Sequence, residues 1–241
     1  EIPDDIRNAL KNAKEKETNS ISKNILSKIL ENIELVKKES TPICQDTGVP
    51  IFYVKYPKLY SQVELRRIIN EAINIATTEI PLRPNAVDCL NDKNIGNKPI
   101  IHFEEDAESP QFEIGLMLKG GGSENVSGIY QLPNTELKAE RNLDGVRRCV
   151  LDAVFKAQGK GCPPYIIGVA IGGTIEETAS LSKKELMRSL NDVNKIPELK
   201  KVEEQILDDI NCLGIGPMGL GGNSTALGVK IKSSFRHPAS F

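Results

Sequence analysis

The sequence has no tryptophan and few aromatic residues, and it lacks the features of several protein classes. No apolar run approaches the ~20 residues of a membrane-spanning helix. The first residues, Glu1–Asp5, are acidic and polar, unlike a secretory signal peptide. A net charge of −2 gives no strongly basic or acidic surface for nucleic acid or membrane. We therefore expect a cytoplasmic protein with no nucleic-acid or membrane partner.

Several binding motifs are also absent. The sequence has neither the G-x-G-x-x-G dinucleotide fingerprint nor a G-x-x-x-x-G-K-[ST] phosphate loop. The cysteines are odd in number and far apart, and no two form a C-x-x-C pair, which argues against both a disulfide framework and a zinc ribbon. The five cysteines are Cys44, Cys89, Cys149, Cys162 and Cys212.

Hydrophobic periodicity divides the chain into helices and strands. Residues 3–38 are predicted to be helical, with a cap at Asn19–Ser20. Further helices are expected at 60–79, 141–158, 176–189 and 197–212, and strands at 51–54, 99–103, 112–118, 165–171 and 226–232. The mixture predicts a mixed α/β (α+β) fold. We expect one domain over residues 1–241, with a helical part at about 1–40.

Two strand features are more specific. The run Tyr165–Ile171 is almost continuously apolar, which is typical of a strand buried on both faces. The acidic stretch Glu104–Ser109 is expected to be a solvated connection.

Glycine and proline mark the stretches most suited to binding. Glycine-rich stretches lie at Lys119–Asn125 and Gly214–Thr225, and a glycine pair follows the apolar run at Gly172–Gly173. Backbone amides of such turns can donate to a small anion, although tight turns that need positive φ explain each one equally well.

Two cysteines stand out by their neighbours. Cys44 precedes Gln45 and Asp46 in a loop bounded by proline and glycine, and Cys162 precedes two prolines. Rigid loops suit thiolates that bind zinc, copper or iron–sulfur clusters, although buried, inert thiols are the commoner case. Cys149 lies in a helical apolar pattern and is expected in the core.

The sequence has two histidines. His102 lies among apolar strand residues, so we expect a structural role. His237 lies in a loop beside Arg236, which suits acid–base chemistry or carboxylate binding.

Five motifs occur together, in a fixed order, over nearly the whole chain. They are CQDTG at Cys44, KGGGSEN at Lys119, GCPPY with GVAIGGT at Gly161, GIGPMGLGGNST at Gly214 and RHPAS at Arg236. With this set the chain resembles the α subunit of two-subunit class I fumarate hydratases and of the related tartrate dehydratases. It is also similar to the N-terminal domain of single-chain class I fumarate hydratases.

The resemblance implies a 4Fe–4S cluster held by three cysteines, with one iron open to substrate. Cys44 and Cys162 match two of the ligands. The third ligand of the family lies beyond the RHPAS motif, so it is expected beyond Phe241 and the native C-terminal segment is expected to be missing. Cys212 precedes the GIGPMGLGG motif, where the family has no ligand, and is therefore expected to be structural.

The resemblance also assigns other residues. Asp46 and His237 correspond to catalytic positions, and Gln45, Arg83 and Gly122 to substrate-binding positions. A β subunit supplies the remaining active-site residues in the family, so we expect a heteromer with β, together with homodimerisation of α.

The implied reaction is the reversible hydration of fumarate to (S)-malate, a step of the tricarboxylic acid cycle. The retained Gly-Gly-Thr, Gly-Gly-Gly-Ser and Leu-Gly-Gly patterns favour fumarate over L(+)-tartrate, which stays an alternative substrate. A non-catalytic binding module of the same fold is a second alternative, and a nucleotide-binding protein is a third.

Overall fold

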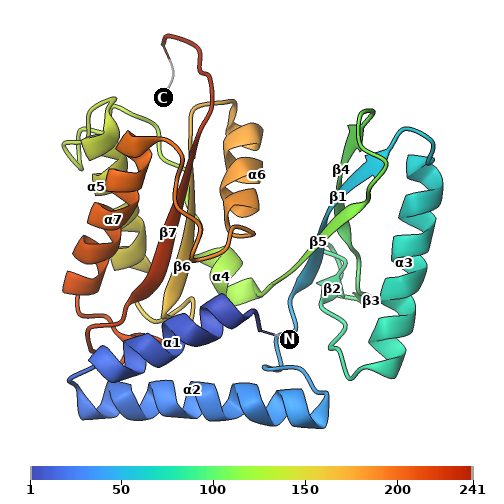
Figure 1. Cartoon of the computed structure of the whole chain (residues 1–241), viewed down its shortest axis with the longest axis horizontal. Helices are drawn as coiled ribbons and strands as arrows, with labels where there is room; N and C mark the ends of the chain where they lie inside the picture. Colours follow the sequence, from blue (N-terminus) through green and yellow to red (C-terminus); the bar gives the residue numbers. More distant parts are fainter. Residues whose placement is uncertain (1, 240–241) are drawn as a thin grey trace. The chain divides into compact units, whose positions relative to one another are not determined.

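The computed structural model describes residues 2–239. The chain forms two compact units (Figure 1). Unit 1 contains the chain up to Glu31 and from Asn125 onward, and unit 2 contains Asn32–Glu124. The expectation of one domain over residues 1–241 stays a prediction.

The chain begins with two helices, α1 (Asp4–Lys16) and α2 (Ser20–Glu39). Asn19 caps α2, because its Oδ1 accepts hydrogen bonds from the amides of Ile21 at 2.9 Å and Ser22 at 3.2 Å. The predicted helical region and its cap are confirmed. The boundary between the two units falls within α2.

Unit 2 is a small three-stranded sheet with one long helix. Its elements are β1 (Val49–Pro57), α3 (Gln62–Glu79), β2 (Ala86–Val87), β3 (Asn94–Gly96), β4 (Ile100–Asp106), β5 (Glu113–Lys119) and the start of α4 (Gly121–Asn125). The strand order is β4-β1-β5, with β1 parallel to β4 and antiparallel to β5.

Alternation along β1 explains the packing of unit 2. Val54 and Tyr56 point to one face, where they are buried together with Ile69 of α3. The three predicted strands of this unit are confirmed. The acidic connection is shorter than predicted, because Glu104, Glu105 and Asp106 pair with Lys55, Tyr56 and Pro57 of β1 and so extend β4.

Unit 1 contains a two-stranded parallel sheet surrounded by helices. Besides α1, its main elements are α5 (Leu143–Ala157), β6 (Tyr165–Ile171), α6 (Ile175–Glu185), α7 (Pro197–Cys212), the 3-10 turn η1 (Pro217–Gly219) and β7 (Ala226–Ser233). β6 and β7 are parallel, and α6 and α7 lie on the crossover between them. α6 packs on β6, α7 on β7 and α5 on α7.

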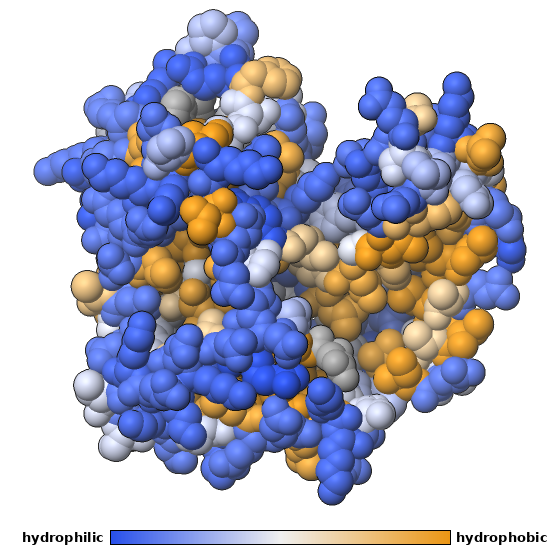
Figure 2. All heavy atoms as spheres, viewed as in Figure 1, coloured by the Kyte–Doolittle hydropathy of each residue, from blue (hydrophilic) through white to orange (hydrophobic). Residues whose placement is uncertain are grey.

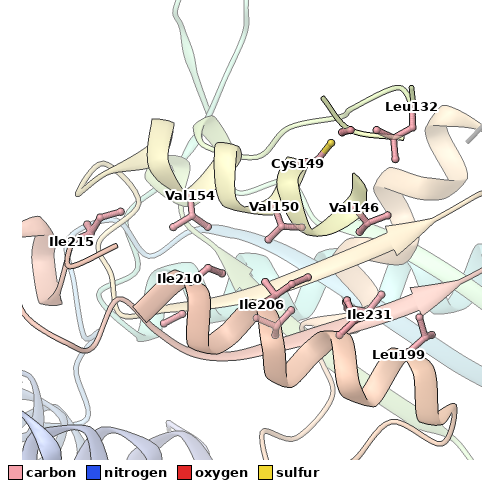
Figure 3. Close-up of a cluster of buried hydrophobic side chains, with 14 residues drawn as sticks. Leu132, Val146, Cys149, Val150, Val154, Leu199, Ile206, Ile210, Ile215 and Ile231 are labelled. Carbon is pink, nitrogen blue, oxygen red and sulfur yellow. The ribbon is translucent and has the colours of Figure 1, made fainter. Parts of the chain in front are cut away.

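The core of unit 1 lies between α5, α7 and β7 (Figure 3). Ile206 and Ile210 of α7 are fully buried, and Val150 and Val154 of α5 pack in the same cluster. Cys149 is 5% exposed there, which confirms its predicted place in the core.

β6 differs from its prediction. Every residue of β6 is half-buried, and none is fully buried. The continuous apolar run had predicted a strand covered on both faces. In the described residues β6 pairs with β7, and α6 is the main helix packed on it, which leaves every residue of the strand partly exposed. The mixed α/β class itself is confirmed. Among the described residues, no helix is long and apolar enough to cross a membrane.

Candidate functional site

The CQDTG motif forms the loop that joins α2 to β1. The side chain of Asn32 in α2 donates a hydrogen bond to the carbonyl of Ile43 at 2.9 Å, which anchors the start of the loop. Cys44, Gln45 and Asp46 are all exposed. The Cys44 thiol lies 3.4 Å from Gln45 Oε1. The loop therefore presents three predicted site residues at the surface of unit 2.

Asp46 joins this loop to the glycine-rich stretch. Its Oδ2 accepts a hydrogen bond from the amide of Gly121 at 2.8 Å, and its Oδ1 accepts one from the amide of Gly48 at 3.1 Å. The contact follows from strand pairing, because Val49 at the start of β1 lies opposite Lys119 at the end of antiparallel β5. Residues just before β1 and just after β5 therefore meet.

Glycine is required at Gly48 in this contact, and the absence of a side chain at Gly120 leaves room for Asp46. Gly48 has φ +82°, and a Cβ there would lie 2.8 Å from the backbone of Leu118 and Lys119. A Cβ on Gly120 would lie 3.0 Å from Asp46 Oδ2. These glycines let the loop approach the end of β5 closely enough for the Asp46 carboxylate to reach the amide of Gly121.

The stretch Lys119–Asn125 was predicted to be a loop, and this prediction is wrong in part. Gly121–Asn125 form the short helix α4, whose first turn is closed by a 3.1 Å bond from the amide of Glu124 to the carbonyl of Gly120. Ser123 Oγ also donates to that carbonyl, at 2.9 Å. Gly122 is therefore the second residue of a helical turn, and it is exposed.

Arg83 lies on a segment that is bonded to the same loop. Thr47 Oγ1 donates to the carbonyl of Arg83 at 3.2 Å, and the Asn85 side chain donates to Thr47 Oγ1 at 3.0 Å and to the Gly48 carbonyl at 3.1 Å. The Arg83 residue is exposed. Unit 2 thus brings together Cys44, Gln45, Asp46, Arg83 and Gly122.

Sequence reasoning missed the residues that hold this arrangement. Asn97 is 8% exposed, accepts from the amide of Asn85 at 3.0 Å and donates to Thr77 Oγ1 at 3.0 Å. Thr47 lies in the CQDTG motif but was given no structural role, and Asn85 was not singled out. The available signal was a polar residue, Asn97, two residues before the predicted strand 99–103 and far in sequence from the CQDTG loop.

Cys162 lies in unit 1, in the turn between α5 and β6. Its thiol is exposed and its φ is +59°, an uncommon value for a residue other than glycine. The amide of Cys162 donates to the carbonyl of Gly159 at 3.1 Å, and the carbonyl of Pro163 accepts from the amide of Met218 at 2.7 Å. The GIGPMGLGG motif therefore supports the Cys162 turn.

His237 follows β7 and is exposed. Its Nδ1 accepts a hydrogen bond from the amide of Ala239 at 3.1 Å. Arg236 donates to the carbonyls of His237 and Pro238 at 3.2 and 2.8 Å. The preceding residues run beside the end of β6, since the amide of Gly173 donates to the carbonyl of Phe235 at 2.7 Å.

Cys162 and His237 lie at opposite ends of the β6–β7 pair. Cys162 precedes the first residue of β6, whereas His237 follows the last residue of β7, and the two strands are parallel. A strand of this length spans roughly 20 Å, at about 3.3 Å per residue. Unit 1 therefore does not bring these two predicted site residues together.

The remaining cysteines differ in their surroundings. Burial raises the pKa of the Cys149 thiol, which makes this thiol less suited to ligate a metal. Cys89 and Cys212 are exposed, the latter at the last residue of α7. Within residues 2–239, no three Cys, His, Asp or Glu side chains are gathered as a metal-binding group.

The donor set agrees in part with the expected cluster. Cys44 and Cys162 are exposed thiols on bonded loops, which suits thiolate ligation. The two lie in different units, and the third ligand was predicted to lie outside the described residues. Cys44 and Cys162 are therefore the candidates in this chain for holding a cluster.

Comparison with known proteins agrees with the motif set. A family model described as "Fumarate hydratase (Fumerase)" matches residues 1–241. A Geobacillus stearothermophilus protein, provisionally named a class I fumarate hydratase, is 42% identical over 100% of this chain and 48% of its own length. A Methanocaldococcus jannaschii protein, provisionally named an L(+)-tartrate dehydratase subunit alpha, is 40% identical over 99% of this chain and 85% of its own.

The Escherichia coli K12 L(+)-tartrate dehydratase subunit alpha is 32% identical over 99% of this chain and 79% of its own length. This chain thus spans about half of the G. stearothermophilus relative and most of the two alpha subunits. The predicted resemblance is confirmed. The chain belongs to the fumarate hydratase (Fumerase) family.

Proposed function

We propose that the chain is the α subunit of a 4Fe–4S-dependent hydro-lyase that reversibly hydrates fumarate to (S)-malate together with a β subunit. The alpha-subunit names of two relatives support the subunit role. The observation that carries the proposal is the bonding of Asp46 to the Gly121 amide and of Thr47 to the Arg83 carbonyl. These bonds hold the loop that carries Cys44 and Asp46 beside the backbone of Arg83, at one end of the β4-β1-β5 sheet.

The proposed roles follow from side-chain chemistry. Arg83 would bind a substrate carboxylate, since a planar guanidinium can make two parallel hydrogen bonds to it. Gln45 would orient the substrate through its amide, and Gly122 through a backbone N–H. Cys44 and Cys162 would hold the cluster, with a third cysteine from beyond residue 241. When bound, the cluster supplies a Lewis-acidic iron with an open coordination position.

We assign Asp46 to proton transfer at the carbon next to the hydroxyl-bearing carbon of malate. Each Asp46 oxygen accepts one backbone N–H, so the carboxylate is fixed in place and each oxygen keeps a free lone pair. Fixed geometry of this kind is what proton transfer needs. His237 is the second acid–base candidate.

His237 can serve the proposed site only from a second copy if Cys162 belongs to the same site. The two lie at opposite ends of β6–β7 within one chain. A symmetric α dimer whose interface joins these two ends is the arrangement that would bring His237 of one protomer to Cys162 of its partner. Homodimerisation of α is therefore part of the proposal.

The test uses the full-length chain, produced anaerobically with its β partner. We expect bound iron and sulfide, absorption near 400 nm, and conversion of fumarate to malate. An iron-free complex that neither hydrates fumarate nor dehydrates malate would contradict the proposal. Comparing kcat/KM for malate and L(+)-tartrate distinguishes a fumarate hydratase from an L(+)-tartrate dehydratase.

An Asp46→Asn variant separates an enzyme from a non-catalytic binding module. We expect kcat to fall by roughly 10²–10⁴-fold, the usual contribution of a positioned acid or base. Asparagine retains one acceptor oxygen, so one of the two backbone amides loses its acceptor. Asn85→Asp is the matched control for loop disturbance, because Asn85 bonds the same loop through Thr47 and Gly48. Equal losses in both variants would remove Asp46 from the chemistry.

A further inference from the structure

Backbone conformations that side chains rarely adopt gather around the Cys162 turn. In residues 2–239, six residues other than glycine have positive φ, and three of them are Gln158 at 49°, Cys162 at 59° and Met218 at 55°. Gln158 and Cys162 bracket the turn after α5, and Met218 donates its amide to Pro163 in the same turn. Such conformations persist only where the surroundings enforce them.

The Tyr165 hydroxyl holds the turn on the side before Cys162. It accepts a hydrogen bond from the amide of Gly161 at 3.1 Å and donates one to the carbonyl of Gln158 at 2.7 Å. Tyr165 is itself fixed as the first residue of β6, where its amide donates to the carbonyl of Thr225 at 2.8 Å. One side chain from the sheet thus bridges both ends of residues 158–161.

The other side of the turn is fixed by close backbone contact. A Cβ on Gly219 would lie 2.5 Å from Gly159 Cα, and a Cβ on Gly159 would lie 2.9 Å from the carbonyl oxygen of Met218. Only glycine at both places lets the two loops approach this closely. The amide of Met218 then reaches the carbonyl of Pro163 at 2.7 Å, directly after Cys162.

Burial raises the pKa of the Tyr165 hydroxyl more than the hydrogen bond from the Gly161 amide lowers it. The Tyr165 hydroxyl therefore stays protonated and remains a donor to Gln158 across the neutral range. The neighbouring Cys162 side chain is exposed while the backbone on both sides of it is held.

We propose that Tyr165 and the paired glycines Gly159 and Gly219 are positioning residues, which fix Cys162 in its left-handed conformation so that its thiolate can ligate the cluster. This inference rests on the proposed function. Residues that orient a metal ligand without touching the metal typically change its affinity by 10–100-fold. Tyr165 would act on Cys162 in this way, because it bonds the backbone of the turn that carries the thiol.

The main test compares Tyr165→Phe with Tyr130→Phe in the full-length chain with its β partner. Each variant loses one tyrosine hydroxyl of unit 1. The Tyr165 hydroxyl bonds the backbone of the Cys162 turn, whereas the Tyr130 hydroxyl donates to the side chain of Asp152 at 2.8 Å. With an iron chelator present, we expect the 400 nm absorption of Tyr165→Phe to decay about tenfold faster than that of Tyr130→Phe. Equal decay rates in the two variants would overturn the proposal.

A second measurement needs no cluster. In iron-free protein, mass spectrometry after thiol alkylation reports the labelling rate of Cys162 separately from that of Cys212. We expect Tyr165→Phe to change the Cys162 rate and leave the Cys212 rate unaltered. If the Cys162 labelling rate changes but the full-length complex never binds iron, the positioning role stands and the proposed function is rejected. An unchanged Cys162 rate would reject the positioning role.

Discussion

The two units differ in how much apolar surface they bury. Unit 1 encloses a cluster of fourteen buried residues built from α5, α7, β7 and adjoining loops. The corresponding cluster beneath α3 in unit 2 contains Val54, Tyr56 and Ile69. Along β5, Ile114, Leu116 and Leu118 are 60%, 47% and 52% exposed, and Figure 2 shows apolar side chains at the surface of unit 2.

The candidate residues follow the same division. Cys162 projects from a turn that rests on the well-packed unit 1, whereas Cys44, Asp46 and Arg83 lie on loops of the thinner unit 2. Those loops do not rest on a deep core. They are held by hydrogen bonds from one loop to another, mostly to the backbone. The comparison indicates that polar contacts hold the candidate residues of unit 2, whereas the Cys162 turn of unit 1 is held by hydrogen bonds together with close backbone packing.

The largest expected effect comes from removing either candidate ligand. Cys44→Ser and Cys162→Ser should each abolish fumarate hydration and lower the bound iron, because a harder oxygen donor replaces a thiolate. Cys212 is also exposed, and the Cys212→Ser variant should retain both the bound iron and the fumarate hydration. Iron analysis and a fumarate assay on the anaerobic α–β complex measure the outcome. If only one of the two substitutions lowers bound iron, the two units do not share one cluster.

The second prediction tests whether Cys162 and His237, at opposite ends of the β6–β7 pair, serve one site from different protomers. Cys162→Ser and His237→Gln chains, each carrying a different tag, are co-produced with β, and dimers containing both are isolated. If His237 acts on the site of the partner protomer, one of the two sites in each mixed dimer is intact, so about half of the wild-type activity should return. Mixed dimers without activity would show that the two residues serve one site within a chain.

A cross-link between protomers checks the same geometry without activity. Roughly 20 Å of strand separates the two ends, so a short bismaleimide can join Cys162 to His237→Cys only between chains. The iron-free α–β complex is used, with the other exposed cysteines replaced by serine. Covalent α dimers are expected, and Cys162→Ser should remove them. A fully active His237→Gln homodimer would instead remove His237 from the mechanism.

Local signals in the sequence predicted most of the fold. Asn19 capped the helix where expected, and the five longer strands were found by their apolar patterns, whereas the short strands β2 and β3 were missed. The burial of β6 was not predicted correctly, because an apolar run does not show which other elements cover the faces of the strand. The helix α4 was missed, since glycine-rich sequence favours turns and five residues are too few for a periodic pattern.

Sequence reasoning named candidate site residues but gave no geometry for them. The motifs and the family resemblance pointed to Asp46 and Arg83, but the Gly121 amide that holds Asp46 depends on β1 pairing with β5 in an antiparallel register. The separation of Cys162 from His237 likewise depends on β6 and β7 being parallel. Both are long-range pairings, which no local pattern in the chain specifies.

Core truncations should have the next largest effect and should distinguish the two units. Ile206 is fully buried in unit 1, so Ile206→Ala should lower the free energy of unfolding by about 3–5 kcal/mol. Ile69 is 8% exposed in the smaller cluster, and Ile69→Ala should cost about 2 kcal/mol. Chemical denaturation measures both. Hydrogen exchange should show the β1 amides opening at lower free energy than the β7 amides, and equal protection would contradict the comparison.

The smallest effect concerns Asp152 of α5. A hydrogen bond from Lys156 at 2.7 Å, and a second from Tyr130 at 2.8 Å, lower the pKa of the Asp152 carboxyl in the folded state. A lowered carboxyl pKa contributes stability that is present above the unfolded-state value of about 3.9 and is lost as pH falls below it. Asp152→Asn should therefore reduce stability at pH 7 by about 1 kcal/mol and flatten the loss between about pH 5 and 3.

The matched control for Asp152 lies in unit 2. Asp106 makes a 2.7 Å ion pair with Lys55, which lowers the pKa of Asp106. The lysine is exposed in both pairs, 36% for Lys55 and 68% for Lys156, so solvent weakens both. Asp152 also accepts from the part-buried Tyr130 hydroxyl, so Asp106→Asn should change the pH dependence less than Asp152→Asn does. Urea titrations of both variants at several pH values measure the difference. An equal or larger change in Asp106→Asn would mean that the ion pairs of the thin unit stabilise the chain as much as those beside the packed core.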